Sequence, residues 1–378
     1  MTPARLLLLA AVATAAPDAC RNDTAFRKTL AASAERARAF AAAAARGEAV
    51  VGHHRPLLGF FLAKTGSNSQ QHYLLSALAS EGLAAHAGCA PRGAGGRTGC
   101  LAAPEQREAT GCAPAFGNHF RPEALVEALA EANRLNAGDK CRREGWPAPG
   151  DADLTRRGLQ RSVCTAVLRD PVTRAVSAFY EFKYGKRTNL TAPAYLEKHG
   201  AEAFAGLVSM HGGYQAWTKD WPAVFENCFL GTTEDFDSML GTLSRVLPLP
   251  ETTRGQRFRS GPKPGLLKEH WPALYAALRP RLAADLRLWR DARCVAAAQR
   301  RAVAGFSRLL SDAQEDLLFD ASCAVCWSGQ PAARTHRGRQ MPLPSRWMRC
   351  GKGKRAVGRA AGDHCRRVAH LAQRPNAR

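Results

Sequence analysis

The chain has 378 residues, with 54 lysines and arginines against 32 acidic residues and a formal net charge of +22. This length accommodates one large α/β domain with extensions, and the charge favours a polyanion or an anionic surface as partner. The composition excludes a polytopic membrane protein, because no stretch after residue 12 is apolar enough to span a bilayer.

Residues 1–16 are predicted to form a signal peptide. Arg5 is followed by the apolar run 6–12 and by the small residues 13–15, which are typical of a cleavage site. A short type II membrane anchor is the alternative. Either one directs the chain to the secretory pathway, to the Golgi lumen or outside the cell. We therefore expect no nucleic acid as partner, and no membrane contact beyond a possible N-terminal anchor.

The elements that follow alternate between apolar strands and helices. An Ala-rich helix is predicted over 24–46, with Asp23 or Thr24 as its cap. Strands are predicted over 57–62, 163–168 and 225–231. Helices are expected after the first two strands and over 122–136, 192–221, 234–247 and 271–310, with a linker over 137–160 and a loop over 252–266. Such alternation favours a parallel sheet covered on both faces.

The composition divides the chain into four parts. An N-terminal helix over 17–50 follows the signal peptide, and the main domain covers 51–310. Within it, 83–150 is a Cys-rich insertion with a linker. Residues 311–378 form a basic, Cys-containing extension that we expect to be mostly irregular.

Lys64-Thr65-Gly66-Ser67-Asn68-Ser69 follows the first strand directly. Gly66 permits a tight turn, the hydroxyl groups supply donors, and Lys64 supplies a positive charge. A small-residue turn between a strand and a helix forms an anion cradle, because free N–H groups and the positive end of the helix dipole face the ligand. The segment departs from a Walker A loop, whose lysine comes after the last glycine. An ordinary Gly/Ser helix cap is the alternative.

Arg169-Asp170-Pro171 follows the second strand in the same way, and Ser177 lies two turns further along the predicted helix. Pro171 fits the first turn of a helix. From these positions Arg169 and Ser177 can hold one phosphate group between them. The alternative is a capping ion pair between Arg169 and Asp170.

These two segments resemble those of the sulfotransferases that use 3′-phosphoadenosine-5′-phosphosulfate (PAPS), and are most similar to the heparan-sulfate and uronyl 2-O-sulfotransferase group. Residues 64–69 look like the 5′-phosphosulfate loop of these enzymes. Residues 169–180, continued by 182–185, look like their 3′-phosphate element. Weaker similarities extend the resemblance over about 57–303, at 229–236, at 258–263 and at 285–289.

The resemblance implies a P-loop-like three-layer α/β/α fold with a central parallel sheet. It further implies transfer of a sulfuryl group from PAPS to a carbohydrate hydroxyl by in-line displacement, without a metal. Residues 64–69, Arg169 and Ser177 would then bind PAPS, with Arg259 and Lys263 from a nucleotide-covering loop. Lys64 would also stabilise the charge that develops as the sulfuryl group leaves.

The general base that the resemblance implies is His119, in the segment Phe116-Gly117-Asn118-His119-Phe120. Imidazole has a pKa near neutrality, which suits proton abstraction from a hydroxyl. The family carries His-Gly-His here, whereas this chain has Gly117 in place of one histidine. His53, His54 and Glu81 are the reserve candidates.

Two other functions remain open. A P-loop kinase-type phosphotransferase would need a Ser or Thr directly after a Gly-Lys pair, which this chain lacks. A non-catalytic, secreted, basic glycan-binding protein would bind an acidic polysaccharide without using PAPS. The residues predict neither the acceptor sugar nor an oligomeric state.

Twelve cysteines behind a signal peptide predict disulfides. Four of them fall in the insertion, and a zinc site is a second interpretation of the C-terminal group: Cys323, Cys326, Cys350 and Cys365. The sequons at Asn22 and Asn189 are in keeping with the same compartment.

Overall fold

We describe the fold from a computed structural model. It describes residues 20–52, 54–60, 62, 65, 115–118, 121–135, 142–181, 188–209, 213–249 and 270–308. The signal peptide, the whole nucleotide-covering segment 258–263 and the basic C-terminal extension lie outside these residues.

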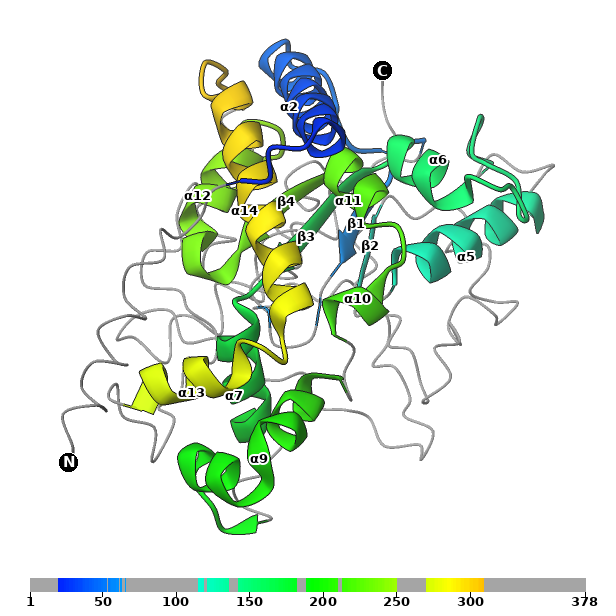
Figure 1. The fold of residues 1–378 in the computed structure, drawn as a ribbon. Helices are drawn as coiled ribbons and strands as arrows, with labels where there is room; N and C mark the ends of the chain where they lie inside the picture. The colour runs from blue at the N-terminus through cyan, green and yellow to red at the C-terminus, as the bar shows by residue number, and fades with distance from the viewer. Residues whose placement is uncertain are drawn as a thin grey trace, which may run out of the picture.

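A parallel sheet of four strands stands at the centre of the described part (Figure 1). The strands are β1 (Leu57–Phe60), β2 (Ala115–Asn118), β3 (Val163–Leu168) and β4 (Cys228–Thr232), in the spatial order β2-β1-β3-β4. Leu57 of β1 pairs with both Ala115 and Val163. The prediction of an α/β fold with a parallel sheet is confirmed.

Successive residues of the strands enter two different hydrophobic clusters. Leu58, Cys164 and Leu230 belong to the first cluster, with the aromatic residues of α10 (Tyr214–Trp217) and α11 (Trp221–Asn227). Leu57, Val163 and Phe229 belong to the second, with α12 (Phe236–Leu243) and the C-terminal half of α2 (Thr24–Ala45). Both faces of the sheet are therefore buried, as strands with almost no polar residues require.

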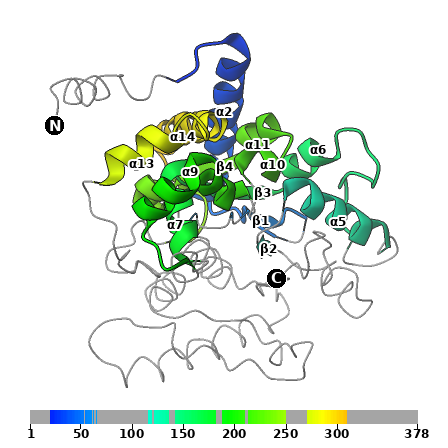
Figure 2. The same cartoon turned by 60° about the horizontal axis from the view of Figure 1, so that its bottom comes forward.

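The remaining helices surround this sheet. They are α5 (Pro122–Leu135), α6 (Leu154–Gln160), α7 (Pro171–Glu181), α9 (Ala192–Ser209), α13 (Trp271–Leu278) and α14 (Ala283–Val303), with a 3-10 turn, η1, at Thr233–Asp235. Figures 1 and 2 show α5 and α6 on the β2 side of the sheet, while α7, α9 and α13 form a separate group beyond the end of β3. That group has its own core, built around Phe179 and Phe204, whose rings stack.

Three predictions are wrong in detail. No strand was predicted in the Cys-rich insertion, but the insertion supplies β2 at the edge of the described sheet. The linker over 137–160 contains α6. The third predicted strand begins later than expected, at Cys228, because Phe225 lies in α11, where its ring packs against Trp221.

Two disulfides join described residues. Cys20 pairs with Cys294 of α14 across 274 positions of the chain, and Cys164 pairs with Cys228 between neighbouring strands. The expectation of disulfides is thus confirmed at these positions, and it fits an oxidising compartment. The cysteines of the insertion and of the C-terminal extension lie outside the described residues. No helix in the described ranges is long and apolar enough to cross a membrane.

Candidate functional site at the carboxyl ends of β1 and β3

The strand order reverses direction between β1 and β3. From β1 the chain moves outward to β2 on one side, and from β3 it moves outward to β4 on the other. In open parallel sheets, ligands bind outside the carboxyl ends of the strands at such a switch point, because the connections there leave in opposite directions and open a crevice. The two predicted anion cradles follow these same two strands.

The turn after β1 is described at two residues. Thr65 is fully buried, its backbone N–H donates to the carbonyl of Leu62 at 3.3 Å, and its hydroxyl donates to the same carbonyl at 2.8 Å. The chain therefore turns tightly right after the strand. Lys64 and the residues 66–69 of this cradle lie outside the described residues.

Arg169, the first residue after β3, has its backbone clamped by Tyr214. The Tyr214 hydroxyl accepts from the Arg169 N–H at 2.8 Å and donates to the Arg169 carbonyl at 2.6 Å. The Arg169 side chain turns toward α7, where its Nε donates to the hydroxyl of Thr173 at 3.1 Å. The direction of this cation is thus set by the main chain and by the first turn of α7.

Asp170 begins α7. Its Oδ1 accepts from the Thr173 N–H at 2.8 Å, as a helix N-cap does, and its own N–H donates to Glu234 at 3.0 Å. The Asp170 carboxylate therefore caps α7, and its negative charge also favours the charged form of the Arg169 guanidinium. Pro171 occupies the first helical position, as the sequence predicts.

Ser177 lies on the same face of α7 as Thr173. Thr173, Ser177 and Tyr180 are the partly exposed residues of a helix whose other described side chains are buried. Their spacing of four and three positions places them in one stripe along the helix. Because Arg169 contacts the first of the three, the structure places Arg169 and Ser177 along one partly exposed face.

The electrostatic environment of Arg169 is mixed. Burial lowers the pKa of Arg169, whereas the negative charge of Glu234 opposes that shift. Burial also raises the pKa of Asp170, although hydrogen bonds from the Thr173 N–H and from Tyr275 favour its ionised form. Burial and the hydrogen bond to Asp170 raise the pKa of Tyr275. An anion bound beside Arg169 would therefore meet an arginine that is already partly desolvated.

Tyr214 is positioned in turn by residues that are distant in the sequence. Its N–H donates to Asp285 of α14 at 3.1 Å, and the guanidinium of Arg174 lies 4.9 Å from the centre of its ring. No role was predicted for four residues around Arg169, namely Tyr214, Glu234, Tyr275 and Asp285. Glu234 and Asp285 fall in stretches that carry the family resemblance, and this resemblance could have marked them as candidate site residues. Tyr214 and Tyr275 had no such signal.

The other predicted site residues are placed as follows. His119, His53, Glu81, Arg259 and Lys263 lie outside the described residues. His54 is exposed and precedes β1, so it is at the opposite end of that strand from Thr65. In the described ranges, no group of three or more His, Cys, Asp or Glu side chains is arranged to hold a metal ion.

Comparison with known proteins adds no relative. No protein-family model matches the chain, and neither the curated proteins nor the solved structures contain a significant match.

Proposed function

We propose that the protein is a PAPS-dependent sulfotransferase that transfers a sulfuryl group to a hydroxyl of a carbohydrate. One observation carries the proposal: the two segments that resemble PAPS-binding elements follow the two neighbouring strands between which the sheet order reverses. A nucleotide with separate phosphate groups at both ends of its ribose needs two anion cradles side by side. The proposal includes the P-loop-like three-layer form of the fold.

Arg169 and Ser177 would bind the 3′-phosphate in this proposal. The Arg169 backbone is fixed by Tyr214 and the cap of α7 by Asp170, so little ordering is left to occur when the anion binds. The bidentate geometry of a guanidinium matches a phosphate group. Residues 64–69 would bind the 5′-phosphosulfate, and Arg259 and Lys263 would cover the nucleotide.

Lys64 and His119 would perform the chemistry. Lys64 would stabilise the negative charge on the departing phosphate oxygen, and His119 would accept the proton of the attacking hydroxyl. His119 is the residue that follows β2, and Asn118 at the end of β2 pairs with Phe60 at the end of β1. The chain therefore leaves β1 and β2 at the same edge of the sheet, where the sulfuryl group would be transferred.

A luminal or secreted location belongs to the same proposal. The sequon residues Asn22 and Asn189 are both exposed, and Asn189 adopts a positive φ of 53°, which asparagine tolerates better than most residues. Both side chains are thus accessible for glycosylation. An acidic polysaccharide is the proposed acceptor class.

The test compares three ligands on the full chain by thermal shift. PAP, the desulfated form of PAPS, is expected to raise the melting temperature more than ATP with Mg²⁺ does. Equal shifts from ATP and PAP would favour the kinase-type alternative. A shift from a sulfated glycan alone would favour the non-catalytic glycan-binding alternative. Transfer of radiolabelled sulfate from PAPS to a glycan acceptor would then establish the activity.

A further inference from the structure

A second basic site lies on the outer side of β4. It is a cleft of about 200 Å³ between α12 and α14, and none of its lining residues belongs to β1, β3 or α7. Its lining includes three arginines of α14, namely Arg290, Arg293 and Arg300. We propose that this cleft binds the sulfate or carboxylate groups of an acidic saccharide, at a site separate from the one that follows β1 and β3.

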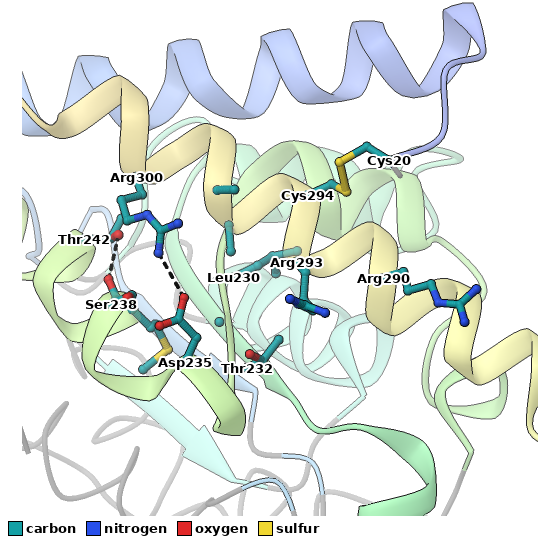
Figure 3. A pocket seen from close by; sticks show the side chains of 14 residues that line it. Cys20, Leu230, Thr232, Asp235, Ser238, Thr242, Arg290, Arg293, Cys294 and Arg300 are labelled. Atoms are coloured by element: carbon teal, nitrogen blue, oxygen red, sulfur yellow. Dashed lines mark hydrogen bonds and ion pairs between the residues drawn. A yellow bond between two sulfur atoms is a disulfide. The ribbon is translucent and has the colours of Figure 1, made fainter. Parts of the chain in front are cut away.

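The three arginines form a row along one side of α14. Arg290, Arg293 and Arg300 are separated by three and seven positions, which keeps them within a narrow arc of the helix and spreads them over roughly 15 Å. Figure 3 shows their guanidinium groups on the same side of the helix, with Arg293 near Thr232. A row of separated cations suits the repeated charges of a linear polyanion better than one compact phosphate.

The cleft is held in shape by its neighbours. The guanidinium of Arg293 lies 5.0 Å from the centre of the Trp289 ring, which supports it from the side. Gly231 allows α12 to approach β4 closely, since a Cβ there would lie only 2.3 Å from the sulfur of Met239. The Cys20–Cys294 disulfide joins two other lining residues. Such preorganisation lowers the entropy cost of binding.

The polar groups in the cleft favour a saccharide over a nucleobase. Hydroxyls of Thr232, Ser238 and Thr242 line it, whereas its lining contains no aromatic side chain on which a base could stack. Asp235 is the only acidic residue in the lining, and it forms an ion pair with Arg300 at 2.9 Å. An anionic ligand would therefore compete with Asp235 for Arg300.

The proposal is tested with one variant that is expected to strengthen saccharide binding and one that is expected to weaken it. Asp235→Asn removes the competing carboxylate and is expected to strengthen binding of a heparin-derived tetrasaccharide by about two- to fivefold. The double variant Arg290→Ala with Arg293→Ala is expected to weaken it about tenfold. Alanine is the best helix former, so these changes on α14 leave the helix intact.

The matched control removes the same charge from the same helix. Arg287 and Arg301 are exposed on α14 and do not line the cleft. Their double substitution by alanine is expected to change the affinity less than about twofold, since only long-range attraction is lost. Affinities are measured by titration calorimetry on the full chain, so that any binding by the basic C-terminal extension is common to all variants.

Two further ligands show which negatively charged groups the cleft recognises. A hyaluronan tetrasaccharide, which carries carboxylates without sulfates, reports on carboxylate recognition, and a short single-stranded oligonucleotide reports on nonspecific attraction. Preferential loss of saccharide binding in the cleft variant supports the proposal. Equal losses in the cleft and control variants, or equal effects on the oligonucleotide, would overturn it. PAP binding is measured alongside, because it tests the proposed sulfotransferase function independently of the cleft.

Discussion

Arg36 and Arg169 are both partly buried cations, but their side chains form hydrogen bonds with different kinds of groups. The Arg36 guanidinium donates to the carbonyls of Asn227 at 2.9 Å and Ser162 at 2.7 Å, with two more bonds to the end of α6. Burial lowers the pKa of Arg36 to about 10. Carbonyls at helix ends carry partial negative charge, so they stabilise this cation without a carboxylate. Arg36 is thus a structural residue, whereas the face that Arg169 shares with Ser177 is partly exposed.

This contrast at the residue scale leads to a prediction for Arg169. Arg169→Ala is expected to weaken PAP binding by about ten- to a hundredfold, because a charge-assisted contact to a phosphate is lost. Arg161 is the matched control, since it is exposed and precedes β3 while Arg169 follows the same strand. Arg161→Ala should leave the affinity unchanged in the same titration. Unaltered PAP binding by the Arg169 variant would remove this residue from the proposed site.

Asp285 leads to a prediction of pH dependence. Burial raises the pKa of Asp285 above its ordinary value of 3.8. A raised pKa in the folded state means that the folded protein binds the proton more tightly. The stability contributed by this group is therefore complete below pH 3.8 and is lost as the pH rises through the raised value.

The measurement compares the wild type with Asp285→Asn, which cannot ionise. The free energies of unfolding of both proteins are obtained from urea denaturation between about pH 4 and pH 7. We expect the stability advantage of the wild type over the variant to shrink as the pH rises. A difference that is constant or that grows with pH would show that Asp285 is not destabilised in its ionised form.

At the scale of elements, a side chain of α14 forms hydrogen bonds with the backbone of β4. β4 is the edge of the described sheet, where unpaired backbone groups would otherwise be exposed. The Gln299 amide accepts from the Leu230 N–H at 2.9 Å and donates to the Cys228 carbonyl at 2.8 Å. It also donates to Ser33 of α2 at 2.8 Å, so one side chain joins a strand to two helices.

Gln299→Met tests this role. The methionine keeps the length of the side chain but leaves the Leu230 N–H and the Cys228 carbonyl unsatisfied in a buried place. We expect the free energy of unfolding to fall by about 2–4 kcal/mol, as measured in urea. The control is Gln160→Met at an exposed position, which should change the stability by less than about 0.5 kcal/mol. Similar losses in both variants would contradict the proposed role of Gln299.

At the scale of the whole molecule, a disulfide links the first described residue, Cys20, to α14 near the end of the described chain. Cys20 precedes α2 and is bonded to Cys294 in α14, and Arg21 beside it forms an ion pair with the buried Asp291 at 3.1 Å. In Figure 3, α2 runs alongside α14. The N-terminal helix α2 is therefore linked covalently to α14 and packs into the second hydrophobic cluster.

Removing this link should destabilise the whole domain. The double variant Cys20→Ser with Cys294→Ser is expected to lose about 2–5 kcal/mol of unfolding free energy, because the disulfide closes a very long loop. Arg21→Ala removes the ion pairs with Asp291 and Asp23 but keeps the disulfide, and it should lose less, about 1–2 kcal/mol. Equal losses from the two changes would show that the disulfide contributes little beyond the ion pair.

The sequence by itself determined the local elements with strong patterns. The predicted elements include the helix that begins at Thr24, the apolar strand 163–168 and the helix opened by Pro171. Asp23 was one of two candidate caps for the first helix, and the structure has it as the cap. Each element depends on contacts between residues close in the chain, such as the Asp23 side chain accepting from the Phe26 N–H at 2.8 Å. Pro and capping residues report such contacts directly.

Only the tertiary structure decided which distant groups meet. The strand order that places β1 beside β3, the clamp of Tyr214 on Arg169 and the pairing of Cys20 with Cys294 join residues at least 45 positions apart. The sequence carries no periodic signal for such contacts, because they arise from the packing of whole elements. β2 was missed for the same reason: its four residues become a strand only because β1 supplies a pairing edge.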